Sequence, residues 1–204
     1  METFLNPARQ ESWASGPFLH FLVLLNQDED YRAYARAHRE LLGGLDEHLG
    51  VVPEDWLHCT VQGIYAPTTA EQTEQLITAA RRELEGMRPF TVQMGPAWPG
   101  VTAVTVAMYP ETGVADLNKR VRAAAEAVPG IELRPVAAKF WAHSTLAYAR
   151  DGDFDDRTLN RGLRSLRPER ADVTIDRIHL VNQQQDPEAG YYTWEVVEEF
   201  PFAS

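Results

Sequence analysis

The chain has 204 residues, fits one domain or two closely joined lobes, and contains no apolar run approaching the ~20 residues needed to span a bilayer. Its 19 Lys and Arg against 30 Asp and Glu give a formal net charge of −11, which disfavours duplex DNA and long RNA as ligands, since their binders cluster Lys and Arg against phosphates. Cys59 is the only cysteine, so no intramolecular disulfide and no Cys-rich metal site can form, and we expect a soluble protein of the cytoplasm.

The first half of the chain alternates between strand-like and helix-like patterns. The predicted order is strand, helix, loop, strand, helix, strand and turn, at about 18–25, 29–45, 46–56, 56–65, 70–86, 90–94 and 95–100. The first strand is an apolar run with one polar side chain well inside it, His20. Thr69 and Gln72 have the spacing of a capping box, which satisfies two free backbone N–H groups where a helix begins.

The second half repeats this alternation. Here the predicted order is strand, helix, loop, strand, helix and two strands, at about 101–108, 113–128, 129–139, 139–148, 156–166, 173–181 and 191–200. Asp155 or Asp156 is expected to cap the last helix. The final two strands are expected to form a hairpin joined by a polar loop at 182–190.

Two short stretches match each other, Leu-His-Cys-Thr-Val and Ala-His-Ser-Thr-Leu, with the histidines at positions 58 and 143. Both fall in predicted strands, where side chains alternate between faces. His58 and Thr60 therefore share one face, and His143 and Thr145 do the same. Two polar groups about 7 Å apart on a strand suit the oxygen atoms of a phosphate, so two such pairs predict a two-sided site.

The two histidines are 85 residues apart, and a shift of that length also superposes the neighbouring predicted elements. We therefore predict an α+β fold with a pseudo-two-fold duplication, in which two mainly antiparallel sheets backed by helices face a central groove. The expected organisation is a single bilobal domain over residues 1–204. Its N-terminal repeat covers about 17–95 and its C-terminal repeat about 100–200, and the lobes can exchange strands.

The paired motifs, His-Cys-Thr-Val at His58 and His-Ser-Thr-Leu at His143, resemble those of the two-histidine (2H) phosphoesterase superfamily. The resemblance is to its 2′-5′ RNA ligase-like and cyclic phosphodiesterase branch, and it extends from about Phe18 to Phe200. It implies a bilobal fold with a central groove and metal-independent cleavage or transfer at a phosphodiester. The implied substrates are a 2′,3′-cyclic phosphate and a 2′-5′ linkage.

The residue types fit that chemistry. Two imidazoles with pKa values near 6.5 can hold opposite protonation states at neutral pH, one as general base and one as general acid. By analogy with cyclic phosphodiesterases, His58 is assigned as the acid and His143 as the base, although the sequence itself does not order the two roles. Thr60 and Thr145 would donate hydrogen bonds to the non-bridging phosphate oxygens.

Four further residues are candidates for substrate binding. Trp56, Gln62 and Trp141 share the faces of the His-Thr pairs, and His20 is expected either to line the groove or to lie at the edge of the core. The two tryptophans could stack on a base or instead cap the strand ends as part of the core. By alternation, Tyr148 falls on the opposite face and is excluded.

The predicted function is a metal-independent phosphodiesterase acting on a small nucleotide, a cyclic phosphate or a short RNA end. The alternatives are a nucleotide- or RNA-end-binding module without turnover, and a phosphate-ester enzyme of a specialised small-molecule pathway. We expect no cofactor and no metal site, because the histidine spacing matches no metal motif. We also expect no long nucleic acid and no membrane as partners, and a monomer.

Overall fold

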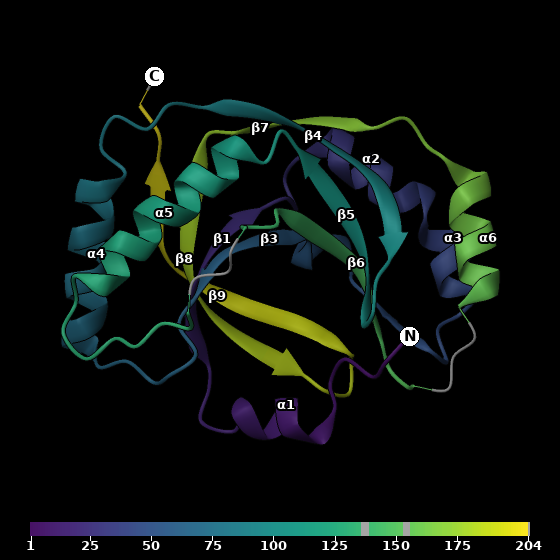
Figure 1. The fold of residues 1–204 in the computed structure, drawn as a ribbon, viewed down its shortest axis with the longest axis horizontal. Helices are drawn as coiled ribbons and strands as arrows, with labels where there is room; N and C mark the ends of the chain where they lie inside the picture. Colours follow the sequence, from purple (N-terminus) through teal and green to yellow (C-terminus); the bar gives the residue numbers. More distant parts are fainter. Residues whose placement is uncertain (136–138, 153–155, 204) are drawn as a thin grey trace.

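Two antiparallel sheets form the centre of the computed structural model of this chain, which describes residues 1–135, 139–152 and 156–203 (Figure 1). The strands are β1 Phe18–Leu24, β2 Leu49–Val51, β3 His58–Gly63, β4 Phe90–Pro99, β5 Ala103–Tyr109, β6 His143–Ala149, β7 Ala171–Ile175, β8 Arg177–Asp186 and β9 Tyr191–Pro201. The helices are α1 Pro7–Ser12, α2 Glu29–Ala37, α3 Arg39–Gly43, the 3-10 turn Glu54–Trp56, α4 Ala70–Glu83, α5 Thr112–Glu126 and α6 Arg157–Leu166.

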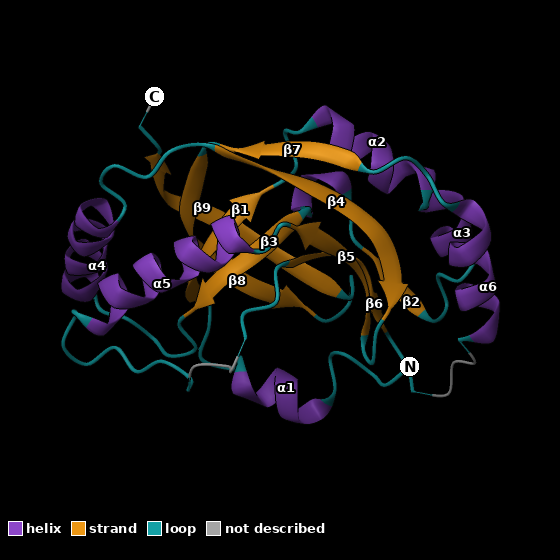
Figure 2. Cartoon of the chain, turned by 45° about the horizontal axis from the view of Figure 1, so that its top comes forward, coloured by secondary structure: helices purple, strands orange, loops and turns teal. Residues whose placement is uncertain are grey.

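The first sheet has the strand order β3-β1-β8-β9 and the second has the order β2-β6-β5-β4-β7. Every pairing in both sheets is antiparallel. Helices α4 and α5 lie together at one end of the molecule and α3 and α6 at the other (Figures 1 and 2). The predicted α+β class with two antiparallel sheets is confirmed.

Strand β1 separates the main core from the groove between the sheets. Phe21 and its neighbours on the same face join the main apolar core, and Phe21 is completely buried. On the opposite face, Leu22 packs with Val181 and Trp194 in a smaller cluster, and His20 lines the cavity described below. An apolar run buried on both faces is typical of a central strand, and β1 lies between β3 and β8.

The three long helices confirm the predictions made for them at about 70–86, 113–128 and 156–166. The capping box is present, because Gln72 N donates to Thr69 Oγ1 at 3.1 Å and Thr69 N donates to Gln72 Oε1 at 2.9 Å. Asp156 occupies the N-cap of α6 without a side-chain hydrogen bond, and Asp155 lies outside the described residues.

The helix predicted at 29–45 is divided into α2 and α3 at His38. The His38 ring lies 2.9 Å from the carbonyl oxygen of Tyr34 and so occupies an acceptor at the end of the first helix. The loop predicted at 46–56 is also wrong in part, because it contains β2, which pairs with β6, and a 3-10 turn. Strand β2 has only three residues, which is too short for a periodic pattern to mark it.

The turn predicted at 95–100 is wrong, because β4 continues to Pro99. The register between β4 and β5 shifts between Met94 and Ala97. Pro96 falls within this irregularity, where its missing N–H group does not remove a regular ladder hydrogen bond. The Gly-Pro pair is therefore a bulge inside a strand.

The strand predicted at 173–181 is in fact parts of two strands in different sheets. Strand β7 pairs with β4, and β8 pairs with β1 and β9. The polar segment predicted as a loop at 182–190 belongs to β8 as far as Asp186. Its amide side chains include Gln183, which lines the cavity, so apolar alternation could not reveal this part of the strand.

Both histidine strands carry an irregularity at an equivalent place. The register of β1 against β3 shifts between Phe21 and Leu22, just after Thr60 on the histidine strand. The register of β5 against β6 shifts between Val104 and Thr105, just after Thr145. Each histidine strand thus carries one extra residue beyond its threonine, which changes the alternation of the side chains that follow.

Helix α1 was not predicted, because residues 1–13 show no apolar period. Asn6 caps it by accepting a hydrogen bond from Arg9 N at 3.0 Å, and a proline stands at its first position. None of the helices in the described part of the chain has the length and apolar character needed to cross a bilayer.

Candidate active site

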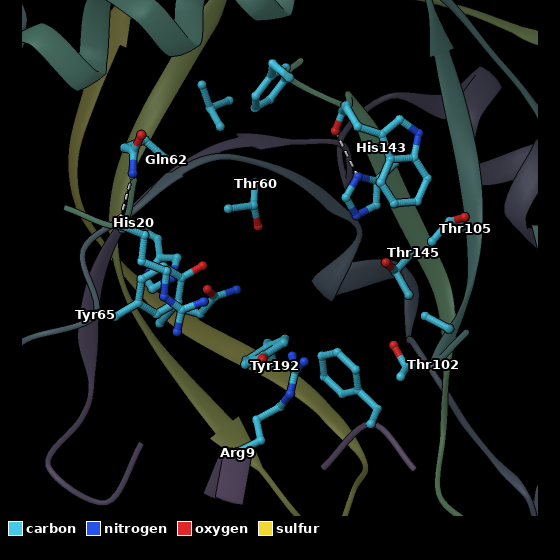
Figure 3. Close-up of a pocket in the computed structure, with 18 of the residues that line it drawn as sticks. Arg9, His20, Thr60, Gln62, Tyr65, Thr102, Thr105, His143, Thr145 and Tyr192 are labelled. Carbon is cyan, nitrogen blue, oxygen red and sulfur yellow. Dashed lines mark hydrogen bonds between the residues drawn. The ribbon is translucent and has the colours of Figure 1, made fainter. Parts of the chain in front are cut away.

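A cavity of about 1250 Å³ lies between the two sheets. Figure 3 shows His143, Thr145 and Thr105 on one wall and His20, Gln62 and Tyr65 on the facing wall. Thr60 lies between the two groups (Figure 3). The other residues that line the cavity include Gln183, Tyr148, Tyr192, Trp141, Trp13 and Phe4.

His58 and His143 are held in the same way. His58 Nδ1 lies 2.9 Å from the carbonyl oxygen of Trp56, and His143 Nδ1 lies 3.0 Å from that of Trp141. A carbonyl can only accept a hydrogen bond, so Nδ1 carries the proton in both rings. Nε2 is therefore the unprotonated nitrogen of each neutral ring and the atom that can accept a proton.

His58 is the more deeply placed ring, with 7% of its surface exposed. Its Nε2 lies 3.3 Å from Gln183 Nε2, and its ring packs edge-on against Trp194. His58 is not among the described residues that line the cavity, whereas Gln183 is. Gln183 therefore connects the buried ring to the cavity, a role that sequence reasoning missed.

Burial lowers the pKa of both rings. The pKa of His58 falls from 6.5 to about 4, because burial disfavours the charged imidazolium and the nearby His143 opposes a second positive charge. The pKa of His143 is also lowered by burial. Both histidines are therefore neutral at pH 7 without ligand.

Hydroxyl groups gather on the walls of this cavity. Thr60 and Thr145 both line it, as the strand alternation predicted. Thr105 and Thr102 also line it, and Thr105 is paired with Thr145 across β5 and β6. Sequence reasoning missed these two threonines, because nothing in the apolar run around them marks the strand face that meets the groove.

The structure separates the two tryptophans that were candidates for base stacking. Trp141 lines the cavity, is 53% exposed, and stacks on the His143 ring with the centroids 4.0 Å apart. Trp56 is not among the described lining residues. It packs edge-on against Trp194 at 4.8 Å, which is the core role considered as its alternative.

His20 and Gln62 both line the cavity and are almost completely buried. The His20 ring stacks on Trp13 with the centroids 5.4 Å apart. The Gln62 amide is already engaged, because it donates to Gly63 O at 2.9 Å and lies 3.4 Å from Asn118 Nδ2.

The exclusion of Tyr148 from the site was wrong, because Tyr148 lines the cavity. The irregularity in β6 lies between Thr145 and Tyr148 and reverses the alternation that placed Tyr148 on the far face. Cys59 and Ser144, which come before the irregularities, are buried as expected.

The cavity wall carries cations in an acidic protein, although Arg122 and Lys139 are paired with Glu126 at 2.8 Å and Glu111 at 3.2 Å. Its charged lining residues in the described part of the chain are all cationic: Arg9, Lys119, Arg122, Arg134 and Lys139. No Asp or Glu is among those described lining residues. Within the described ranges, no group of three or more His, Cys, Asp or Glu side chains is arranged to hold a metal ion. The arrangement suits an anion bound between neutral histidines, hydroxyl groups and cations.

Comparisons with known proteins give similarity at the level of structure. No protein-family model matches the sequence, and no curated protein matches it significantly. The crystal structure of TT0787 of Thermus thermophilus superposes with a TM-score of 0.69 at 18% identity, over 91% of this chain and 97% of that one. E. coli LigT complexed with 3′-AMP gives a TM-score of 0.62 at 17% identity, over 92% of this chain and 98% of that one. The MHV ns2 PDE domain gives a TM-score of 0.53 at 9% identity, over 89% of this chain and 99% of that one. At these identities, the similarity establishes a shared fold.

Proposed function

Because the chain has the fold of the two-histidine (2H) phosphoesterases, we propose that it is a phosphodiesterase acting by general acid-base catalysis without a metal ion. Its substrate would be a 2′,3′-cyclic phosphate or a 2′-5′ phosphodiester of a nucleotide or short RNA end, hydrolysed or transferred. One observation carries the proposal. Two histidines on equivalent strands each anchor Nδ1 on a carbonyl oxygen, so that Nε2 is the ring atom that can transfer a proton; His143 lines a cavity whose described charges are all positive, and His58 reaches it through Gln183.

The reaction needs one proton removed from the attacking water or hydroxyl and one delivered to the leaving oxygen. One histidine Nε2 accepts the first proton while the other histidine, in its charged form, donates the second. The hydroxyls of Thr60 and Thr145 would donate hydrogen bonds to the non-bridging oxygens, where negative charge resides in the transition state. The cations of the wall would favour the anionic substrate over water.

The substrate must also bring about the protonation of one ring, since both are neutral in the free protein at pH 7. A bound phosphate raises the pKa of an adjacent imidazole, because the negative charge stabilises the imidazolium. His143 is less buried than His58, so it regains its proton more readily. This order favours His143 as acid and His58 as base, the reverse of the assignment made by analogy.

The test is a metal-free assay, in the presence of a chelator, on 2′,3′-cyclic nucleotides and 2′-5′ dinucleotides. We expect turnover by the wild type, and a loss of about 10²–10⁴-fold in His58→Ala and His143→Ala, which is the usual effect of a positioned acid or base. His48→Ala is the control, since His48 is not among the described lining residues. Full activity in both site variants, with folding verified by circular dichroism, would refute the proposal.

A binding module without turnover is the second candidate. It is favoured by the burial of His58 and by the occupation of its Nε2 by Gln183. It predicts measurable nucleotide affinity by calorimetry together with unchanged ligand after prolonged incubation. Identification of a phosphomonoester product would exclude it.

A further inference from the structure

One part of the cavity is lined by aromatic rings that the proposed reaction does not use. Phe4 stacks on Tyr148 with the centroids 4.1 Å apart, and Tyr192 meets both of these rings edge-on at 5.7 Å. The centroid of the Trp13 ring lies 5.1 Å from that of Tyr192 and 6.2 Å from that of Tyr65. We call these five residues the aromatic wall. All of them line the cavity.

The aromatic wall adjoins the candidate phosphate site. Tyr148 lies on β6, the strand that carries His143 and Thr145. Tyr65 packs edge-on against His20 at 5.0 Å on the facing side of the cavity. Because a Cβ at Gly63 would lie 2.6 Å from both His20 and Tyr65, the glycine leaves the space in which these rings meet. A ligand bound beside His143 and Thr145 would therefore lie next to the aromatic wall.

Two arginines lie on the aromatic wall without a carboxylate partner among the described residues. The Arg134 guanidinium carbon is 3.7 Å from the centre of the Tyr65 ring, and that of Arg9 is 4.1 Å from the centre of the Phe4 ring. Stacking on a ring holds a guanidinium by its flat face and leaves its N–H edges available. Arg122 supports this arrangement by donating to the carbonyl oxygen of Arg134 at 2.9 Å.

The charges of Arg134 and Arg9 both act on the hydroxyl group of Tyr65. Burial raises the pKa of Tyr65, and the charges of Arg134 and Arg9 both oppose that rise. Arg9 acts in the same way on Tyr148, whose pKa is also raised by burial. Both cations therefore lie within electrostatic reach of phenol groups that can themselves donate hydrogen bonds.

Building on the proposed function, we propose that Arg9, Arg134 and the tyrosine hydroxyls of the aromatic wall bind a second phosphate of the substrate, a terminal phosphomonoester distinct from the scissile phosphate. A phosphomonoester carries about −1.5 to −2 charges at pH 7, which matches two guanidinium groups without a carboxylate partner among the described residues better than the single charge of a diester does. Its oxygens suit the paired N–H groups of arginine. The cavity of about 1250 Å³ exceeds the ~300–1,000 Å³ of typical ligand sites and has room for both phosphates.

The test compares two nucleotides that differ only in the second phosphate. Adenosine 3′,5′-bisphosphate and adenosine 3′-monophosphate are titrated into the full chain by calorimetry. We expect the wild type to bind the bisphosphate about tenfold or more tightly, since hydrogen bonds to charged groups contribute about that factor. Arg9→Gln and Arg134→Gln should each reduce this ratio of dissociation constants by about threefold or more.

Arg81→Gln is the matched control. Arg81 also lies over an aromatic ring, Phe200, at 5.6 Å, but it pairs with Glu198 at 2.9 Å and is not among the described lining residues. Arg81→Gln removes the same charge and should keep the wild-type ratio of dissociation constants for the two nucleotides. Because the readout is a ratio within each variant, a general loss of affinity does not imitate the expected result.

Three outcomes would overturn the inference, and each points to a different step of it. Equal affinity of the wild type for both nucleotides would refute the second phosphate site and leave the phosphodiesterase proposal intact. A preference that survives in both Arg9→Gln and Arg134→Gln would refute the assignment to these residues. Failure of the wild type to bind or turn over any nucleotide would refute the proposed function and this inference together.

Discussion

Three histidines near the cavity hold their rings by the same local hydrogen bond. His20, His58 and His143 each place Nδ1 within 3.1, 2.9 and 3.0 Å of the carbonyl oxygen two residues earlier in the chain. In an extended strand this bond fixes both the ring orientation and the tautomer without help from any other element. This leaves Nε2 for other contacts, and in His58 that contact is with Gln183 at 3.3 Å.

The buried histidines should make the protein less stable in mild acid. Burial lowers the pKa of His20 and of His58 from 6.5 to about 4, so the unfolded chain binds protons more readily than the folded one between these values. The free energy of unfolding is therefore highest above pH 6.5 and decreases as the pH falls towards 4. Each ring should reduce the free energy of unfolding by about 2 kcal/mol between pH 7 and pH 5.

Urea unfolding at these two pH values measures the effect. His20→Asn removes one titrating ring while its amide can still donate to Phe18 O. The stability difference between pH 7 and pH 5 should shrink by about 2 kcal/mol in the variant, and carboxylate contributions cancel in the comparison. An unchanged difference would show that His20 titrates normally in the folded protein.

Gln183 is expected to act as a positioning residue for His58. Its amide nitrogen lies 3.3 Å from His58 Nε2 and stabilises the neutral ring by donating to its lone pair. Gln183→Met keeps the length of the side chain and removes the donor, so kcat/KM should fall by about three- to tenfold. The acidic limb of the pH profile should also move to higher pH, because the neutral form of His58 loses a partner.

The control is the exposed neighbour on the same strand. Gln184→Met changes the same chemical group outside the cavity lining and should keep the wild-type rate and pH profile. If Gln183→Met lowers the rate without moving the profile, its role is structural and the assignment to His58 is wrong.

At the scale of elements, the β8-β9 hairpin reaches the other sheet through a close backbone contact. A Cβ at Gly50 on β2 would lie 2.5 Å from the carbonyl oxygen of Gly190 at the hairpin turn. Arg150 fixes the same turn by donating to Glu188 O at 3.0 Å and Ala189 O at 2.7 Å. The hairpin carries Gln183 and Tyr192, so this contact sets the distance between the two walls of the cavity.

Gly50→Ala should therefore destabilise the protein by about 1–3 kcal/mol, because the new methyl group meets backbone that cannot move aside cheaply. Denaturant unfolding measures the change. The control is Gly43→Ala in α3, where a Cβ would meet no atom within 4 Å. That variant should be neutral or more stable by up to about 1 kcal/mol, because alanine favours a helix. Equal stability of both variants would contradict the close contact.

Local patterns predicted the histidine strands and the long helices, but not every residue of the site. The alternation of side chains is reliable only while a strand is regular, and it correctly placed Thr60 and Thr145 on the groove face. An extra residue beyond each threonine has no local sequence marker, so the placement of Tyr148 was wrong. Gln183 was missed because a strand that faces a polar cavity lacks the apolar period by which strands are recognised.

At the scale of the whole molecule, charge is distributed unevenly. The net charge is −11, yet five cations and no carboxylates are found among the described residues that line the cavity. The acidic groups of the described residues therefore lie outside the cavity lining. Such a field draws a small anion into the groove and repels a long polyanion that must also cross the outer surface.

This distribution predicts discrimination by ligand length. A nucleotide should bind more weakly as salt rises from about 0.05 M to 0.5 M, because ions screen the cations that line the cavity. A duplex of about 20 base pairs should fail to displace the nucleotide even at low salt, where binding driven by phosphate contacts would be strongest. Competition followed by fluorescence anisotropy measures both effects. Displacement by the duplex at low salt would show that a continuous basic path reaches the surface, and the protein would then bind long nucleic acid despite its net charge.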